Sequence, residues 1–321
     1  MKLLVTGSSG FIGRRVVELA KAQGISCLTH RSEKQGAAYQ EGVVYKNLSA
    51  SANWRETLDG VDTVIHCAAR VHQMQDAQRD SLSLYRETNV AGTLTLARQA
   101  AEAGVKRFVF LSSIKVNGEI SPPDHPFTPQ VMRPPQDPYG LSKYEAELGL
   151  WQIAQETGLE VTVIRPPLVY GPGVKANFRT MMNWIRKGLP LPLAAVKNKR
   201  SLVFVDNLAD LILLCAHHPQ APGETFLVSD GHDVSTAELL TDMATALGVA
   251  SRIWPMPPRC LLWAAKALGK APVAERLLGS LQVDISHTCD RLAWRPVVAY
   301  PQALSLTASA YQAERDLRDN A

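Results

Sequence analysis

The sequence has few cysteines and no long apolar run, and both shortages narrow the class of protein. Its 321 residues contain five cysteines, which are dispersed and form no C-x-x-C pair. This spacing predicts reduced thiols and offers neither a disulfide framework nor a metal site. The longest candidate for a membrane span, residues 202–216, contains Asp206 and Asp210. We therefore expect no transmembrane segment.

Strong net charge is also missing. The formal net charge is +4, with 20% charged and 46% hydrophobic residues. Lysine and arginine are scattered, which argues against a nucleic-acid partner and is compatible with a small anionic substrate. The apolar stretch between Lys2 and Thr6 is too short for the core of a signal peptide. We expect a cytoplasmic protein with one large α/β domain and an appended lobe.

Strand-like and helical patterns alternate over the first 166 residues. Apolar runs rich in Val, Ile and Phe, typical of strands buried on both faces, recur between helical segments. This repeated strand–helix–strand order predicts an α/β fold with a doubly wound parallel sheet of the Rossmann type. The expected strands are residues 3–6, 25–30, 42–47, 61–67, 106–113 and 160–166, and expected helices include 11–23 and 80–103.

The residue pattern changes after Pro166, where proline-rich stretches interrupt the helical segments. We expect a dinucleotide-binding domain at residues 1–166 and a smaller C-terminal substrate-binding lobe over most of 167–321. The segment at about 200–230 is expected to return to the main sheet.

The segment TGSSGFIG (6–13) follows the first expected strand and opens the first helix. Gly7 permits a tight turn, Gly10 lets the backbone approach a pyrophosphate, and Gly13 allows close packing of helix on sheet. The N-terminus of the helix then offers free N–H groups to the phosphates. This loop predicts a dinucleotide site, with a flexible strand–helix turn as the alternative.

The segment DPYGLSKYEAE (137–147) places Tyr139 and Lys143 one helical turn apart, on one face. Asp137 suits the N-cap, and Pro138 suits the first helical position. A phenol has a pKa of about 10, and a nearby ammonium favours its ionised form. Tyr139 is thus positioned to exchange a proton with an alcohol or ketone as hydride moves.

Six motifs together resemble the extended short-chain dehydrogenase/reductase family, most of all its branch that modifies nucleotide sugars. The resemblance runs from residue 1 to about 210, and beyond it only DRLAWRP (290–296) is similar to the family. Many members of this branch are dimers, so a homodimer is expected. The motifs are TGSSGFIG (6–13), HCAAR (66–70), ETNVAGT (87–93), FVFLSSIKVNG (108–118), YGLSK (139–143) and RPPLVYGPG (165–173).

The resemblance implies roles for individual residues. Tyr139 is similar to the catalytic acid/base, Lys143 to the lysine that lowers its pKa and holds the nicotinamide ribose, and Ser113 to the catalytic Ser/Thr, which leaves Ser112 to packing. Asn177 and Arg200 match substrate-binding residues, Arg200 the arginine that binds the nucleotide diphosphate; a solvated loop is the alternative for Arg200. The implied cofactor-binding residues are Gly7, Gly10, Phe11, Ile12, Gly13, Asn47, Leu48, Ala68, Ala69, Asn89, Tyr139, Lys143 and Pro166.

Departures from the family pattern restrict the chemistry. Ile114 and Lys115 stand where the family's 4,6-dehydratases have an adjacent Asp-Glu pair, which disfavours dehydration. No Cys lies near Ser113, and no His follows Tyr170 within RPPLVYGPGVKANF (165–178), which disfavours the 3,5-epimerase/reductases. Hydride transfer without elimination remains.

The run CLTHRS (27–32) bears on the choice of cofactor. Arg31 lies eighteen residues beyond Gly13, near where an acidic residue would bind the ribose hydroxyls of NAD. A guanidinium there favours the 2′-phosphate of NADP, with His30 and Arg14 as further donors. NADP(H) is therefore the preferred cofactor and NAD(H) the alternative, which Glu33 would serve.

These observations lead to a ranked set of functions. First comes NADPH-dependent reduction of a 4-keto group on a nucleotide-linked sugar, expected to be a UDP-amino sugar. An NAD-dependent UDP-sugar 4-epimerase is the alternative, followed by a reductase of a non-sugar ketone or aldehyde. A catalytically inactive sensor ranks last, because Tyr139 and Lys143 are both present. Residues 251–282 remain open between a substrate cleft, ordinary packing and an oligomer or membrane-surface contact.

Overall fold

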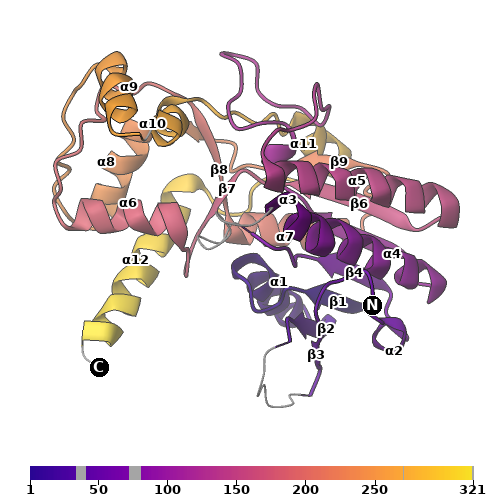
Figure 1. Cartoon of the computed structure of the whole chain (residues 1–321). Helices are drawn as coiled ribbons and strands as arrows, with labels where there is room; N and C mark the ends of the chain where they lie inside the picture. Colours follow the sequence, from indigo (N-terminus) through magenta and orange to yellow (C-terminus); the bar gives the residue numbers. More distant parts are fainter. Residues whose placement is uncertain (34–40, 72–80, 270, 320–321) are drawn as a thin grey trace.

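The structure, a computed structural model, describes residues 1–33, 41–71, 81–269 and 271–319 and contains two sheets (Figure 1). The large sheet has the strand order β3-β2-β1-β4-β5-β6-β9, and all its neighbours are parallel. The predicted doubly wound parallel sheet is thereby confirmed. Its strands are β1 (Lys2–Thr6), β2 (Ser26–Arg31), β3 (Val43–Tyr45), β4 (Thr63–His66), β5 (Arg107–Leu111), β6 (Glu160–Arg165) and β9 (Thr225–Leu227).

Helices cover both faces of this sheet, because successive side chains of a strand point to opposite faces. Leu3 and Val5 are buried in one cluster with α1 and α7, whereas Leu4 is buried in another with α2, α4 and α5. Such two-sided burial explains why the strands are apolar throughout. The helices around the large sheet are α1 (Phe11–Ala22), α2 (Arg55–Leu58), α3 (Ser81–Tyr85), α4 (Gly92–Glu102), α5 (Pro138–Thr157), α7 (Val205–Cys215) and α11 (Ser286–Leu292).

The long helix expected at 80–103 is divided into three parts. Between α3 and α4 the chain forms a π-helical turn, η2 (Arg86–Ala91). Turns of this wider kind are often found at functional sites. Asn89 lies within η2, and Gly92 begins α4.

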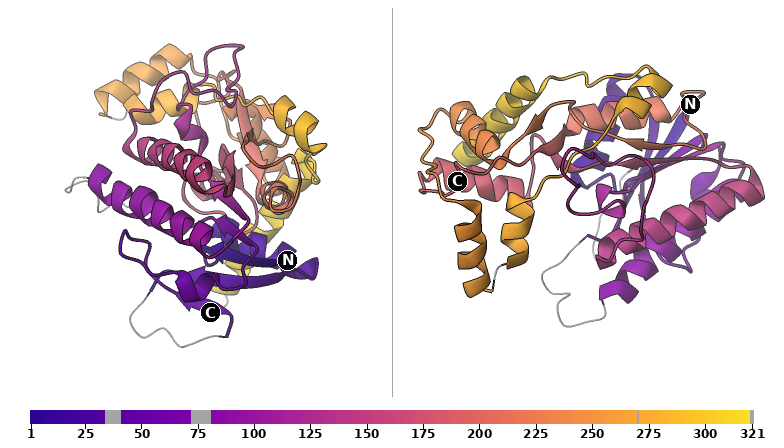
Figure 2. Two further views of the ribbon diagram at one scale, coloured as in Figure 1. Left: turned by 90° about the vertical axis from the view of Figure 1, so that its right-hand side faces the viewer. Right: turned by 90° about the horizontal axis from the view of Figure 1, so that it is seen from above.

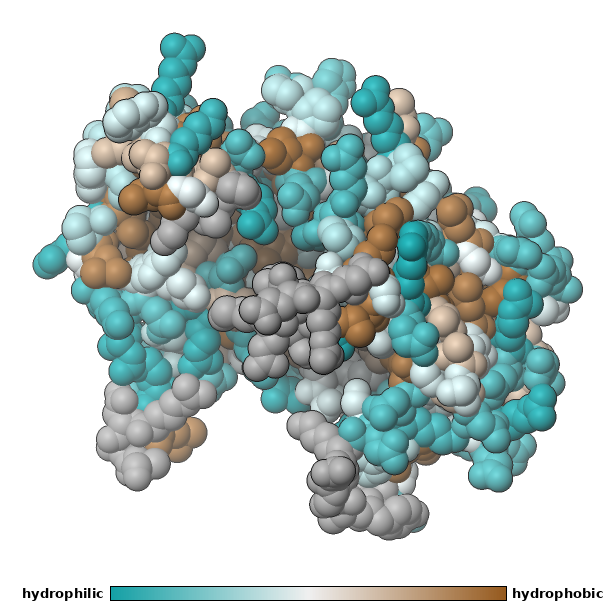
Figure 3. All heavy atoms as spheres, viewed as in Figure 1, coloured by the Kyte–Doolittle hydropathy of each residue, from teal (hydrophilic) through white to brown (hydrophobic). Residues whose placement is uncertain are grey.

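A smaller lobe is built on the second sheet, in which β8 pairs parallel with β7 and antiparallel with β10. Its core includes Tyr170, Phe178, Met182 and Met243. The lobe lies beside the large sheet (Figures 1 and 2), and the face seen in Figure 3 carries hydrophilic and hydrophobic side chains interspersed. Its elements are β7 (Leu168–Tyr170), β8 (Arg200–Phe204), β10 (Asp233–Val234), α6 (Ala176–Arg186), α8 (Thr236–Ala246), α9 (Pro258–Ala267), α10 (Ala271–Leu278) and α12 (Tyr300–Asp319).

The segment expected to return to the main sheet is shared between the two sheets. β8 joins the small sheet, α7 packs on α1, and β9 adds an edge strand to the large sheet beside β6. Asp230 connects the parts, since its buried carboxylate accepts hydrogen bonds from Tyr170, from the Phe204 amide and from Asn207. No described helix is long and apolar enough to cross a membrane.

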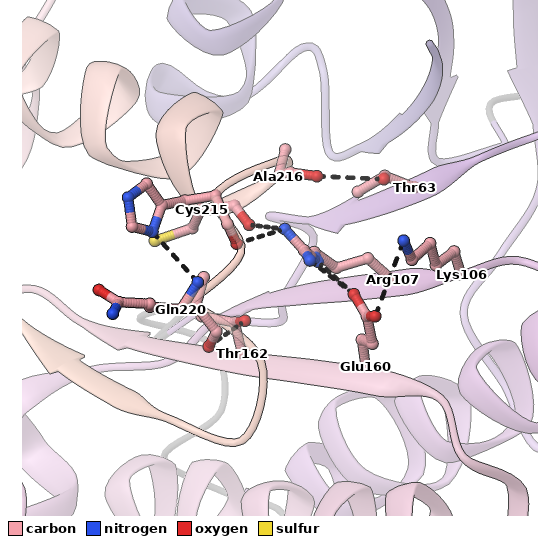
Figure 4. A network of polar contacts seen from close by, with 10 residues as sticks. Thr63, Lys106, Arg107, Glu160, Thr162, Cys215, Ala216 and Gln220 are labelled. Carbon is pink, nitrogen blue, oxygen red and sulfur yellow. Dashed lines mark hydrogen bonds and ion pairs between the residues drawn. The ribbon is translucent and has the colours of Figure 1, made fainter. Parts of the chain in front are cut away.

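A buried arginine fixes the amino ends of β5 and β6 to the end of α7 (Figure 4). The Arg107 guanidinium pairs with Glu160 at 2.6 Å and donates to the carbonyls of Cys215 at 3.1 Å and His218 at 2.9 Å. Each of these bonds is charge-assisted. This network lies at the edge of the sheet opposite the carboxyl ends of the strands and therefore supports the site from below.

Candidate active site

The predicted catalytic residues and the glycine loop lie at the carboxyl ends of the strands of the large sheet. The strand order reverses direction between β1 and β4, and in open α/β sheets ligands bind at such a switch point. The glycine loop follows β1, Ala68 and Ala69 follow β4, and Ser113 and Pro166 follow β5 and β6. Tyr139 and Lys143 approach the same edge on the first turns of α5.

Two positions of the glycine loop leave no space for a side chain. Gly7 has φ +68°, and an added Cβ would lie 2.8 Å from the backbone of Ala68. A Cβ on Gly13 would lie 2.3 Å from the Gly7 carbonyl oxygen. No side chain caps α1, and its first turn has no acidic residue. The helix thus leaves N–H groups and a positive dipole end for an anion, which fits a dinucleotide pyrophosphate.

A buried polar chain supports this loop from inside the sheet. Thr6 Oγ1 lies 2.7 Å from His66 Nδ1 and accepts from the Ala68 amide at 3.3 Å. His66 Nε2 lies 2.9 Å from Thr93 Oγ1. Burial and the nearby Lys143 lower the pKa of His66 well below its usual value, so the imidazole is neutral. The tautomer of the ring sets the direction of both bonds: if Nε2 carries the proton, it donates to Thr93 and Nδ1 accepts from Thr6.

Asn89 is buried and holds the loop after β4. Its side chain is 1% exposed, accepts from the Arg70 amide at 2.8 Å, and donates to the Arg70 carbonyl and to Ser142 Oγ, both at 3.1 Å. Ser142 in turn donates to the Tyr139 carbonyl. Asn89 thereby links the loop after β4 to the first turn of α5, and its expected cofactor contact stays a prediction.

The start of α5 matches the sequence expectation. Asp137 caps the helix by accepting from the Gly140 amide at 2.7 Å, and Pro138 occupies the first turn. Lys143 is 2% exposed, and its ammonium donates to the Leu111 carbonyl at 2.8 Å. Burial lowers the pKa of Lys143 to about 8.

Tyr139 differs from expectation in its electrostatics. Burial, the Asp137 carboxylate and the neighbouring Tyr85 raise the pKa of Tyr139, where Lys143 was expected to lower it. The rings of Tyr85 and Tyr139 meet edge to face at 5.9 Å. Because the Lys143 ammonium is engaged with Leu111, Tyr139 is held as a neutral phenol by this surrounding.

The two serines that follow β5, Ser112 and Ser113, make different contacts. Ser113 Oγ is half-buried and accepts from the Lys115 amide at 3.3 Å, as the N-cap of a 3₁₀ turn, η3 (Ile114–Val116). Ser112 points inward and donates to Glu147 at 2.5 Å, and Glu147 pairs with the buried Arg165. The structure therefore gives Ser112 a polar contact, whereas Ser113 remains the serine nearer the surface.

Arg31 lies at the mouth of a hollow of about 360 Å³ between α1 and β2. Its Nε is buried and has no hydrogen-bond partner among the described residues. Arg14 and Lys21 line the same hollow, with Glu18 and Glu41 as acidic neighbours. This arrangement fits a phosphate or ribose near Arg31.

His30 does not share that position. Its ring is 1% exposed, packs edge-on against Trp54 at 4.9 Å, and places Nε2 2.9 Å from the Lys46 carbonyl. The ring lies on the opposite face of β2 from the Arg31 side chain, because adjacent strand residues point to opposite faces, and a phosphate contact of His30 stays a prediction. His30 acts through its own carbonyl, which accepts from both the amide and the hydroxyl of Ser8 in the glycine loop.

The expected adenine contacts lie in the loop after β3. Asn47 is exposed, lines a second hollow of about 380 Å³ and donates weakly to Glu33 at 3.4 Å. Leu48 packs against α4 so closely that a Cβ on Gly92 would lie 2.9 Å from its carbonyl carbon. The side chains of Phe11 and Ile12 pack against two different core clusters, and the expected contact of these residues with the cofactor stays a prediction.

The expected substrate residues lie on the lobe side. Asn177 is exposed on the first turn of α6, beside Ala176 at φ +52°. The Arg200 guanidinium donates to the carbonyls of Arg276 at 2.6 Å and Gly279 at 3.2 Å, and burial lowers its pKa. These bonds tie Arg200 to the lobe rather than to Tyr139. The contact of Asn177 and Arg200 with a sugar diphosphate stays a prediction.

Several supporting residues were not foreseen. His66 and Glu147 belong to apolar-looking segments, and their partners lie 60 and 18 residues away. Tyr85 stands in the divided helix, where the π turn shifts the helical register. One feature of the sequence could have revealed Glu147: it follows Lys143 by four residues and therefore lies on the same face of α5.

Comparison with known proteins gives consistent results. A family model described as "NAD dependent epimerase/dehydratase family" matches residues 3–229. A Vibrio cholerae protein named UDP-glucose 4-epimerase is 44% identical over 312 residues, covering 96% of this chain and 95% of that one.

Solved structures share the fold over the whole chain. The UDP-glucose 4-epimerase of Thermus thermophilus in complex with NAD has a TM-score of 0.76 at 24% identity, covering 97% of this chain and 99% of that chain. The Thermotoga maritima enzyme of the same name, with UDP-glucose, has a TM-score of 0.74 at 22% identity, covering 98% and 100%.

Proposed function

The chain belongs to the NAD dependent epimerase/dehydratase family of enzymes, and from this premise we propose that it is an NAD-dependent UDP-sugar 4-epimerase. The observation that carries the proposal is Tyr139 one helical turn before the buried Lys143, at the strand edge that also holds the glycine loop. The 44% identity to a protein named UDP-glucose 4-epimerase supports this substrate class.

This proposal reverses the ranking obtained from the sequence. One-way reduction of a 4-keto group ranked first there, chiefly because Arg31 favours NADPH. The relative and the two structural neighbours are named as epimerases, and one neighbour carries NAD. The reductase therefore becomes the second candidate, and the Arg31 hollow is the specific observation that favours it.

Tyr139 is proposed to move the proton at the sugar. Its phenolate would take the proton of the O4 hydroxyl. After the oxidised sugar has rotated in the site, the phenol would return the proton to O4, so that no net proton is gained or lost. When bound at the glycine loop, NAD supplies a reversible acceptor for the hydride of carbon 4. Ser113, on the neighbouring strand end, would hold O4 during both transfers.

The pKa of Tyr139 decides when it can act. Burial, Asp137 and Tyr85 hold it neutral, so an added positive charge is needed to favour the phenolate. Oxidised nicotinamide carries such a charge. Lys143, whose pKa burial lowers to about 8, donates to the Leu111 carbonyl here, and we propose that it turns toward the ribose and the phenol when the cofactor binds.

The cofactor is proposed to be NAD, with NADP as the alternative that Arg31 supports. Glu33 lies beside Asn47 at the second hollow and supplies a carboxylate of the kind that binds ribose hydroxyls. Arg31 would then stack on the adenine or contact the ribose. A homodimer and a cytoplasmic location remain predictions.

Conversion of UDP-glucose to its C4 epimer by the purified enzyme tests the proposal. We expect turnover by the parent chain and a loss of about 10²- to 10⁴-fold in kcat for Tyr139→Phe, with NAD affinity kept. Tyr144→Phe, a change of the same kind five residues along α5, is the matched control and should retain activity. Equal activity of the Tyr139 variant would refute the role of the phenol.

A further inference from the structure

The helical hairpin formed by α9 and α10 carries apolar side chains that no described part of the chain covers. Trp263 is 75% exposed, Leu268 is 74% exposed, and Trp254, just before the hairpin, is 44% exposed. No residue of α9 is buried. The two helices lie side by side and project from the lobe (Figure 2, right).

The exposed residues of α9 form one stripe. Cys260, Trp263, Ala264 and Ala267 follow the spacing i, i+3, i+4 and i+7, and all four are exposed. The opposite face is attached to the lobe, where Leu261 packs against the lobe core. The helix therefore has one apolar face that packs inward and a second that points outward.

Positive charge flanks the outward stripe. Arg259 and Lys266 lie seven residues apart along one side of it, and both are exposed. Residues 251–274 contain four basic residues and no Asp or Glu, and Glu275 on α10 is the first acid after them. Indole rings beside long basic side chains suit the boundary between lipid headgroups and acyl chains, where the cations reach toward phosphates.

From this arrangement we propose that the α9–α10 hairpin is a membrane-surface contact, which seats Trp263 and Leu268 among the headgroups of an anionic phospholipid bilayer. The charge of the segment complements such a surface, and each basic residue near it adds to the attraction. The helix lies on the bilayer and does not cross it, since α9 has only ten residues.

A second copy of the chain fits this face less well. A symmetric contact would bring the same patch against itself, and Arg259 and Lys266 would then face like charges with no acid between residues 251 and 274 to offset them. An anionic surface has no such penalty.

The hairpin is held firmly to the substrate side of the lobe. Asn198 donates to the carbonyls of Leu277 and Gly279, and Arg200 donates to those of Arg276 and Gly279. Contact with a bilayer would therefore fix the orientation of the whole lobe at the membrane. The proposal does not depend on which sugar or cofactor the enzyme uses.

Co-sedimentation with vesicles tests the inference. We expect the full chain to bind vesicles of phosphatidylglycerol and phosphatidylcholine, to bind pure phosphatidylcholine far more weakly, and to show a blue shift of tryptophan fluorescence on binding. Trp263→Ala with Leu268→Ser should weaken binding about tenfold or more, as should Arg259→Glu with Lys266→Glu. Trp184→Ala, which removes a partly exposed tryptophan on α6, is the matched control and should bind as the parent does.

Two results would overturn the inference. One is sedimentation with anionic vesicles that is absent, or that is equal in the parent and both double variants. The other is a change from dimer to monomer in the Trp263 double variant by light scattering, which would make the face a contact between copies. Because all four changed positions are exposed, the variants are expected to fold, and circular dichroism checks this.

Discussion

At the scale of single residues, Arg31 bears most directly on which reaction the enzyme performs. Its guanidinium borders the hollow between α1 and β2, with a buried Nε that no described residue satisfies. In the sequence analysis, reduction ranks above epimerisation mainly because Arg31 favours NADP(H). One side chain can thus suggest a cofactor while the rest of the chain points to another reaction.

Arg31→Asp is expected to weaken NADPH binding far more than NADH binding. The guanidinium pairs with a 2′-phosphate, which NADH lacks, and a carboxylate repels that phosphate. Fluorescence titration of both nucleotides gives the two dissociation constants. Lys21→Asp, on the wall of the same hollow, makes the same change of charge and is the control for a general field effect. Equal losses for NADPH and NADH would remove Arg31 as a selector.

At the scale of elements, close approach between the β3 loop and α4 shapes the cofactor side of the site. Gly92→Ala would ordinarily stabilise a helix by up to about 1 kcal/mol. Here the new methyl group would meet the backbone of Leu48 at 2.9 Å and of Ser49 at 3.0 Å. We expect a lower melting temperature and weaker NAD binding, because the loop must move.

Differential scanning fluorimetry and isothermal titration with NAD measure both effects. Ala91→Gly, one position earlier, changes helix propensity in the opposite direction without adding an atom, and it should lower stability while leaving NAD affinity intact. A Gly92→Ala variant with raised melting temperature and unchanged NAD affinity would show that the approach is not tight.

Elements whose signals are local could be predicted from the sequence. Asp137 and Pro138 predict the start of α5. The spacing of Tyr139 and Lys143 predicts that both lie on one face of this helix. The π turn at Arg86–Ala91 could not be predicted, because its geometry depends on Asn89 bonding to Arg70 and Ser142. The inward direction of His30 likewise follows from strand pairing and from Trp54, which is distant in the chain.

At the scale of the whole molecule, the large sheet provides the cofactor edge and the smaller lobe lies beside it with the expected substrate residues. The family match spans both the sheet and the joining segment, from residue 3 to 229. The α9–α10 hairpin lies on the lobe, apart from α1 and α5 (Figure 1). Chemistry and the proposed membrane contact are therefore separable by mutation.

The most direct test of the proposed epimerase uses UDP-glucose that carries deuterium at carbon 4, with no reductant added. We expect formation of the C4 epimer with deuterium retained at carbon 4, because the hydride leaves and returns within one enzyme molecule. Mass spectrometry and proton NMR of the product measure both the conversion and the label. Absence of conversion under these conditions, together with stoichiometric consumption of NADPH on a 4-keto nucleotide sugar, would contradict the epimerase and restore the reductase.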